Sequence, residues 1–194
     1  MKNQIEEKER GFTVLEIAAV VVVAGIAMAF AVPSITNAMR HYRLNSAMRQ
    51  TIDVLNRAKT EAVAQSRQAG LVIDPEGRRL GVVYYQSDNA TVDRIDFVSL
   101  PDGVSFQRPP QEAAPPDGVV TTGYLTHYSG QLDGYPLQVF NSRGFPVVNS
   151  GPDVVSIFLG NGRDFRAVTM SSVGGIRSYR MNGNAWVNTR AKNY

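Results

Sequence analysis

The sequence of 194 residues contains no cysteine and only two histidines, His41 and His127. The absence of cysteine excludes disulfides, thiol nucleophiles and cysteine-type zinc sites. Neither histidine belongs to a pattern that indicates a metal or catalytic role. The phosphate-binding pattern G-x-x-x-x-G-K-[ST], the nucleophile elbow G-x-S-x-G and the zinc motif H-E-x-x-H are also absent. The sequence therefore predicts no enzymatic activity, no metal site and no cofactor.

Charged residues are also missing from the stretch between Phe12 and Val32, with the exception of Glu16. The residues after Glu16 are almost all Ala, Val, Ile, Met and Phe, so a helix here has no polar face. Residues 12–32 in helical form span roughly 32 Å, which is enough to cross a hydrocarbon core of about 30 Å. We therefore predict a transmembrane helix over residues 12–33.

A hydrophilic decapeptide precedes this stretch, and its three basic and three acidic side chains sum to zero. Two ordinary explanations are a cleaved secretory signal and a plain N-terminal membrane anchor. Neither explains why a carboxylate follows directly after Gly11-Phe12-Thr13. A carboxylate inside a membrane costs about 2.5 kcal/mol or more, which makes Glu16 a candidate functional residue.

The segment Gly11-Phe12-Thr13-Val14-Leu15-Glu16, followed by an apolar run that Pro33 closes, resembles the class III leader of type IV pilins and type II secretion pseudopilins. The resemblance implies that residues 1–11 are a leader peptide. It implies that a prepilin peptidase cuts between Gly11 and Phe12 and methylates the new terminus. In that family Glu16 would pair with an amine of a neighbouring subunit during assembly, in which Pro33 would also take part.

The resemblance also implies a location. The chain would cross the bacterial inner membrane once, with its C-terminal domain in the periplasm or outside the cell. Its partners would be the prepilin peptidase, other pilin or pseudopilin subunits and the inner membrane.

The helical pattern continues beyond Pro33. Apolar residues recur at spacings of three and four, which is typical of one buried helix face: Leu44, Met48, Ile52, Leu55, Ala58 and Ala62. Gly70 is a plausible stop. We predict one long helix from Phe12 to Ala69, with a membrane half over 12–33 and an amphipathic half over 34–70.

Residues 71–194 show the shorter period of strands and form the predicted soluble β-rich domain. Leu71–Ile73 and Leu80–Tyr85 flank the turn Asp74-Pro75-Glu76-Gly77, which predicts a hairpin. Further strands are expected at Arg94–Leu100, Val104–Gln107, Val119–Leu125, Leu137–Phe140, Val154–Leu159, Phe165–Met170, Ile176–Arg180 and Ala185–Val187, and a loop at Arg108–Gly118. The predicted class is α+β, a long helix packed on a largely antiparallel sheet, as in the pilin-like fold.

Two later segments indicate which subfamily of these proteins the chain resembles. Leu55-Asn56-Arg57-Ala58-Lys59-Thr60-Glu61-Ala62 is similar to the L-x-x-A-R-x-E-A stretch of the H-type pseudopilin and FimT-like family, with Lys59 in the arginine position. Val139–Pro146 resembles the family's turn of phenylalanine followed by glycine. This implies a minor pseudopilin of type II secretion, with secreted protein as a candidate cargo. Residues 85–137 match no pattern.

Some FimT-like minor pilins bind DNA through a Gly-Arg-x-Arg loop, which Gly174-Gly175-Ile176-Arg177 resembles with one arginine replaced. Residues 161–194 carry six basic side chains and one acidic, a net charge of +5. Arg166, Arg177 and Arg180 are therefore candidates for nucleic acid contact, although a solvated strand face is the more ordinary explanation of these arginines. Three functions stay open: a type II secretion pseudopilin, a minor type IV pilin for pilus assembly or DNA uptake, and a membrane-anchored binding domain.

Overall fold

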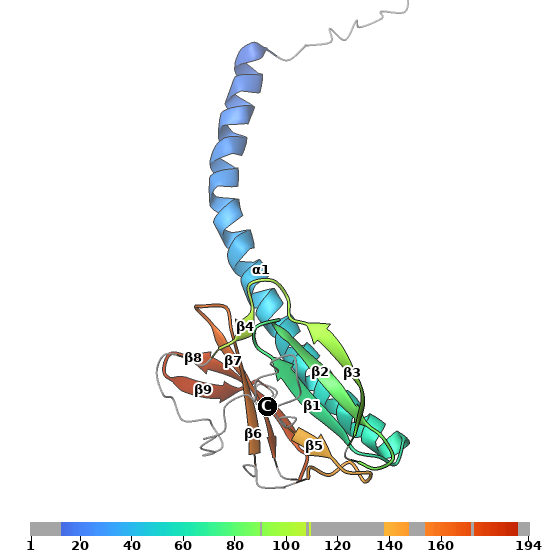
Figure 1. Ribbon diagram of the computed structural model, residues 1–194. Helices are drawn as coiled ribbons and strands as arrows, with labels where there is room; N and C mark the ends of the chain where they lie inside the picture. The colour runs from blue at the N-terminus through green and yellow to red at the C-terminus, as the bar shows by residue number, and fades with distance from the viewer. Residues whose placement is uncertain are drawn as a thin grey trace, which may run out of the picture. The chain divides into compact units, whose positions relative to one another are not determined.

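A computed structural model describes residues 13–89, 91–107, 109, 138–147, 154–171 and 173–189. One long helix, α1, runs from Val14 to Ala64. The chain divides into two compact units, Met1–Met39 and Arg40–Tyr194. All the strands of the described residues belong to the second unit, which combines the later part of α1 with two antiparallel sheets (Figure 1). The predicted α+β class is confirmed.

The nine strands of the described residues form two sheets instead of one. The first sheet has the order β3-β2-β1-β5 and the second has the order β4-β6-β7-β8-β9. Every pairing between named strands is antiparallel. The bounds are β1 Ala69–Asp74, β2 Arg79–Tyr85, β3 Val92–Ser99, β4 Ser105–Phe106, β5 Gln138–Phe140, β6 Val154–Gly160, β7 Phe165–Ser171, β8 Ile176–Asn182 and β9 Ala185–Asn188.

The predicted hairpin is confirmed as β1 and β2, with Ile73 opposite Leu80. The C-terminal strands are confirmed as a meander in which β6, β7, β8 and β9 pair in sequence order. Strands predicted near residues 94, 104 and 137 correspond to β3, β4 and β5. The loop predicted at Arg108–Gly118 and the strand predicted at Val119–Leu125 lie, apart from Pro109, outside the described residues.

The predicted end of the helix is wrong, because α1 stops at Ala64 and Ala69 already belongs to β1. The stop is made by Ser66, whose φ of 51° is left-handed. The amide of Ser66 donates to Val63 O at 3.2 Å, and the amide of Arg67 donates to Ala62 O at 3.2 Å. These two bonds are those of a Schellman cap, in which a left-handed residue closes the last turn. Gly70 is therefore a strand residue and does not end the helix.

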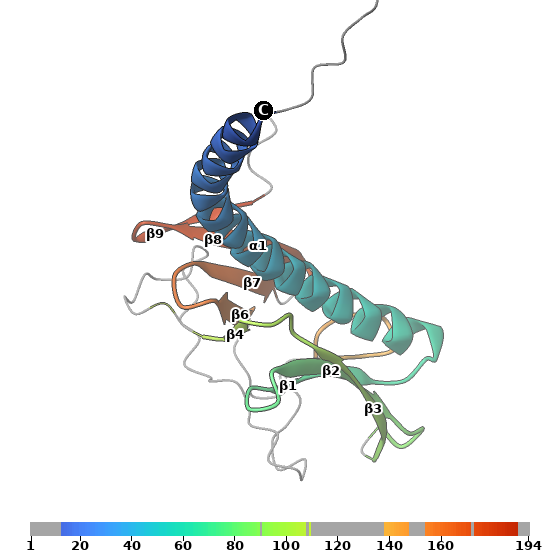
Figure 2. The same ribbon diagram turned by 90° about the horizontal axis from the view of Figure 1, so that it is seen from above.

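One core joins α1 to both sheets. The helix contributes buried residues at spacings of three and four, as the apolar stripe predicted. Alternate residues of β1, β2, β6 and β7 face the helix, because side chains of a strand alternate between its two faces. The principal members of this core are Leu44, Ala47, Leu55, Ala58, Ala62, Leu71, Ile73, Leu80, Val82, Phe140, Ile157, Leu159, Val168 and Met170. Figure 2 shows the later part of α1 running along both sheets of the second unit.

The β1–β2 turn is organised by the buried carboxylate of Asp74. Its Oδ1 accepts a hydrogen bond from the amide of Gly77 at 2.9 Å, and its Oδ2 accepts one from Arg79 Nε at 2.6 Å. Burial by itself raises the pKa of Asp74, but the hydrogen bonds from Gly77 and Arg79 and the charge of Arg79 bring the pKa below its usual value. The charged carboxylate is therefore favoured by folding.

We expect Asp74→Asn to lower the free energy of unfolding by about 1–3 kcal/mol at neutral pH, because it removes a charged acceptor from Arg79. Since the folded pKa is lowered, the stabilisation is present above the usual aspartate pKa and is lost as pH falls through the folded pKa. Urea unfolding of the detergent-solubilised chain, followed by Trp186 fluorescence, measures the difference. A difference between the two proteins that stays constant down to acidic pH would contradict this account.

Candidate functional site

The start of α1 is built from Thr13 and Glu16, which bind each other reciprocally. Both the amide and the hydroxyl of Thr13 donate to Glu16 Oε2 at 2.9 Å. In return, the amide of Glu16 donates to Thr13 Oγ1 at 3.2 Å. Thr13 is thus the N-cap and Glu16 the third helical residue of a capping box, which satisfies donors that the first turn of a helix leaves without partners.

This arrangement holds the acidic side chain at a defined place. A carboxylate near a helix N-terminus is favoured by the partial positive charge of that end. Both bonds from Thr13 go to the same oxygen of Glu16. A carboxylate has two oxygens and about four acceptor sites, so the group can bind a further donor, such as an amine, without giving up the cap.

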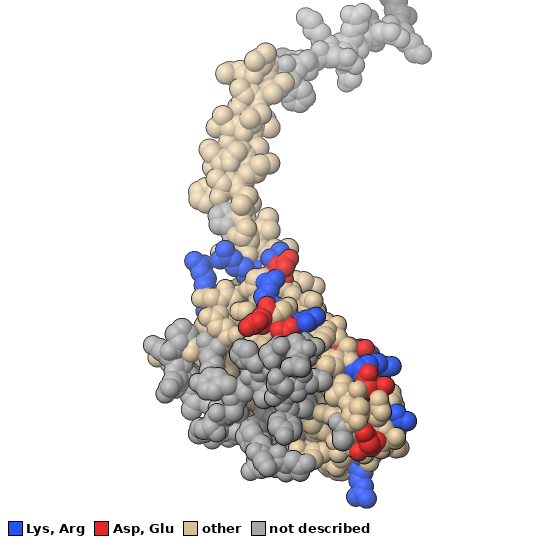
Figure 3. Space-filling view, in the orientation of Figure 1, with Lys and Arg blue, Asp and Glu red and all other residues tan. Residues whose placement is uncertain are grey.

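The part of α1 between Glu16 and Val32 is apolar on all sides. Within the described residues α1 is the one helix that is long and apolar enough to cross a membrane. Its large side chains in this part are exposed, for example Val14 at 87% and Phe30 at 77%. On the face seen in Figure 3 the described side chains of this segment are tan, whereas charged side chains lie on the second unit. Such a surface requires lipid or other apolar helices around it.

The other residues predicted to act in processing and assembly are placed only in part. Gly11 and Phe12 lie outside the described residues. Pro33 lies within α1, which continues past it to Ala64. The expectation that the helix does not end at Pro33 is therefore confirmed, whereas its role in assembly stays a prediction.

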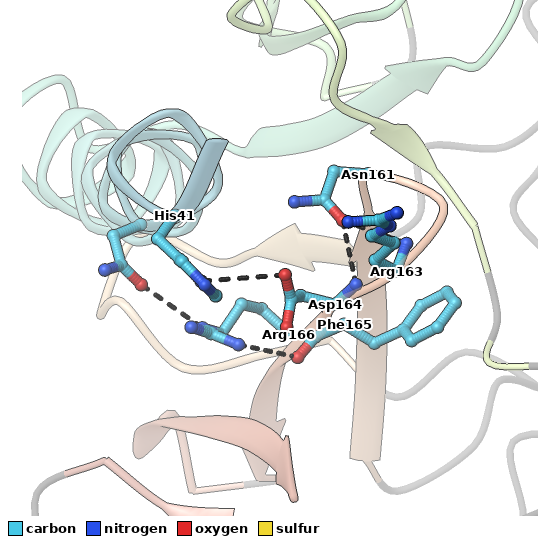
Figure 4. A network of polar contacts seen from close by, with 7 residues as sticks. His41, Asn161, Arg163, Asp164, Phe165 and Arg166 are labelled. Carbon is cyan, nitrogen blue, oxygen red and sulfur yellow. Dashed lines mark hydrogen bonds and ion pairs between the residues drawn. The ribbon is translucent and has the colours of Figure 1, made fainter. Parts of the chain in front are cut away.

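Arg166, one of the candidates for nucleic acid contact, is buried against α1 (Figure 4). Its Nε donates to Asn45 Oδ1 at 3.2 Å, and its Nη1 donates to Phe165 O at 3.0 Å. Burial lowers the pKa of the Arg166 guanidinium from its usual value. Arg166 bonds to the helix and is 8% exposed as a whole residue, so little of its surface is left for a phosphate.

The other two arginines lie on opposite faces of β8. Arg180 is opposite Arg166 in the β7–β8 pair, so these two side chains share the face that looks toward α1. Arg177 is opposite Thr169, three residues further along β8, and an odd spacing places it on the other face. The strand therefore brings Arg166 and Arg180 together but separates Arg177 from them.

His41 has a structural contact. Its Nδ1 lies 3.6 Å from Asp164 Oδ2, which joins α1 to the turn between β6 and β7 (Figure 4). The same turn is held by Asn161, whose side-chain oxygen accepts hydrogen bonds from the amides of Arg163 and Asp164 at 3.1 and 2.8 Å. Across the part of the chain that the structure describes, no three acidic or histidine side chains gather in a way that could hold a metal ion.

Two residues of these sites were not predicted from the sequence. Thr13 had no predicted role of its own, although T-x-x-E before an apolar run is the sequence pattern of a capping box. Asn45, the partner of Arg166, carries no such signal, because the two residues are far apart in the sequence and meet only through the packing of β7 on α1.

No protein-family model matches the chain, and no curated protein matches it either. The solved structures that align with it include two of the minor pseudopilin EpsH from the Type 2 Secretion System of Vibrio cholerae. One alignment has 14% identity and a TM-score of 0.46, and covers 70% of this chain and 95% of that chain. The other has 15% identity and a TM-score of 0.44, and covers 72% and 97%. At such values a shared function does not follow, so the proposed function depends on Glu16 and its surroundings.

Proposed function

We propose that the chain is a minor pseudopilin-like subunit of a type II protein secretion system. A prepilin peptidase removes residues 1–11, and the mature chain begins at Phe12 with a methylated amine. The apolar part of α1 anchors the subunit in the inner membrane as a single span. The unit Arg40–Tyr194 then lies in the periplasm and joins other subunits in a short filament.

The observation that carries the proposal is Glu16, an acid at the start of an apolar helix, held by Thr13. A plain membrane anchor gains nothing from a carboxylate at this position, because the charge opposes insertion. A filament subunit, in contrast, has to pack against similar helices in one register, and the charge helps to select that register. A charge in apolar surroundings tolerates only those placements that give it a partner. In this proposal the partner is the amine of a neighbouring subunit.

A minor type IV pilin with a role in DNA uptake shares the same membrane segment and is the alternative. It is the weaker candidate, because Arg166 is buried and Arg177 lies on the face of β8 opposite to Arg180. Phosphate contacts gain affinity when cations follow one groove. These three arginines do not provide such a groove.

We expect Gly11→Ala to block removal of residues 1–11. The added methyl group has to fit a tight pocket of the peptidase. One such group changes the kcat/KM of an enzyme for its substrate by about tenfold or more, so the precursor should accumulate. The measurement is the intact mass of the chain from cells that contain a prepilin peptidase. Gly25→Ala is the matched control, because nothing lies within 4 Å of the added methyl group and the variant should be processed normally.

Normal processing of Gly11→Ala would refute the proposed function, and equal loss in both variants would mean that the helix, and not the cleavage site, had been damaged. Processing of the wild-type chain must also disappear when the peptidase is removed.

A further inference from the structure

Large hydrophobic side chains are exposed at one place beyond the membrane segment. Among the described residues that follow Tyr42, the large hydrophobics that are exposed are Val63 at 48%, Phe145 at 54% and Val173 at 74%. All the other exposed large hydrophobics of the described chain lie between Val14 and Tyr42. Scattered single residues of this kind need no explanation, but a group of them marks an interaction site.

Two glycine turns place the backbone next to Phe145 and the backbone next to Val173 close to Lys59 and Val63 of α1. Gly144 lies directly on the helix, since a Cβ atom at this residue would be 2.9 Å from Val63 Cγ2 and 3.4 Å from Lys59 Cε. A Cβ atom on Gly174 would be 3.4 Å from Lys59 Nζ and 3.8 Å from Gly144 O. Both glycines have left-handed φ values, 76° and 78°, which a larger residue adopts only with strain. The two turns are therefore fixed side by side over Lys59 and Val63.

The charges at this place are of one sign. Lys59 is half-buried between the two turns, and Arg143 is exposed next to Gly144. Neither forms an ion pair among the described residues. The turns 141–147 and 171–176 contain no acidic residue. The nearby acid of the helix, Glu61, accepts a hydrogen bond from Gln65 one turn further along α1.

We propose that Lys59, Val63, Arg143, Phe145 and Val173, the basic-apolar patch, form the docking surface for another subunit of the filament. The inference depends on the proposed function, because it takes the chain to be a filament subunit. The occupant is a protein segment with an apolar side chain flanked by carboxylates. The apolar residue covers Val63, Phe145 and Val173, and the carboxylates pair with Lys59 and Arg143.

The composition of the patch favours a protein over a nucleic acid. Single-stranded nucleic acid is bound by several aromatic rings on which bases stack. The patch has one aromatic ring, Phe145, and its other apolar members are the valines Val63 and Val173. Contact between these valines and an apolar side chain of a protein removes water from both surfaces, which is favourable. The charged backbone of a nucleic acid does not provide such a contact.

Photo-crosslinking in cells tests the patch. A benzophenone amino acid replaces Phe145 in the full chain, which is co-expressed with the other subunits of the proposed filament. The same amino acid at Ser87, an exposed residue of the β2–β3 turn, is the control. We expect Phe145 to crosslink to one of these subunits, in a peptide that contains Asp or Glu, and Ser87 to give no such product.

A charge reversal sharpens the test. We expect Arg143→Glu to lower the yield of the crosslink from position 145 by about fivefold or more. Replacing the acidic residue of the partner with Lys should then restore the yield. Arg49→Glu is the matched control, because Arg49 is an exposed arginine of α1 outside the patch. It should change the yield by less than about twofold. The fluorescence of Trp186 checks that each variant is folded.

Three outcomes would overturn the inference: a crosslink to a second copy of this chain alone, a product that nuclease removes, or no product from Phe145. The mass of the chain in the same samples reports leader removal separately. A processed chain with no crosslink refutes the docking surface and leaves the proposed function standing. An unprocessed chain refutes the proposed function.

Discussion

Replacing Glu16 with alanine should leave cleavage after Gly11 largely intact and reduce filament assembly by more than about tenfold. Removing one member of a buried charge pair costs about 3–5 kcal/mol, because the remaining charge is left without a partner. In this account that remaining charge is the amine of the neighbouring subunit. The measurement is the fraction of the chain that crosslinks into higher oligomers in membranes, next to the fraction that is processed.

The capping box gives Glu16 a second possible role, and two further variants separate the roles. Glu16→Gln keeps the cap, since glutamine also serves at this position, but removes the charge. Thr13→Val removes the hydroxyl of the cap and costs about 0.5–2 kcal/mol of helix stability, while the charge stays. We expect Glu16→Gln to assemble as poorly as Glu16→Ala and Thr13→Val to assemble measurably better. The opposite order would mean that Glu16 acts as a cap and not as a charge.

Replacing Phe140 with alanine should lower the free energy of unfolding by about 3–5 kcal/mol. Phe140 is fully buried, and its strand β5 pairs with β1, where Ala69 lies opposite Phe140. The deletion leaves a cavity in the core that joins both sheets to α1. Urea unfolding of the detergent-solubilised chain, followed by Trp186 fluorescence, measures the loss.

Phe145 is the matched control, because it is the same residue type five positions later but is 54% exposed. Phe145→Ala should change the free energy of unfolding by less than about 0.5 kcal/mol, as is usual for surface positions. Equal losses in the two variants would contradict the described packing of this segment. A stable Phe145→Ala protein that no longer binds its partner would agree with the basic-apolar patch.

The elements that follow from local pattern could be predicted from the sequence. The apolar stripe from Leu44 to Ala62 has the helical period, and it packs as that period requires. The β6–β9 meander was predictable because short strands alternate with glycine turns such as Gly162 and Gly183, both of which have positive φ. The end of α1 was not predictable from Gly70, because Ser66 adopts the left-handed conformation that glycine usually takes at this position.

The candidate site could be predicted only where its contacts are local in sequence. The Thr13–Glu16 box spans three residues, and its pattern was present in the sequence. The basic residues were visible as a charge excess, but charge alone does not tell which side of a strand a residue faces. The register of β7 with β8 places Arg166 and Arg180 on one face and Arg177 on the other. The basic-apolar patch depends on three segments that are distant in sequence, and only the packing on Lys59 brings them together.

In the proposed function the chain is cut before Phe12 and built into a filament through the new terminus. The decisive measurement is the intact mass of the wild-type chain, taken from the membranes of cells with a prepilin peptidase. We predict a chain that lacks residues 1–11 and carries one added methyl group on the amine of Phe12. A chain that still begins at Met1, or one cut within the apolar run as a secretory signal would be, would contradict the account.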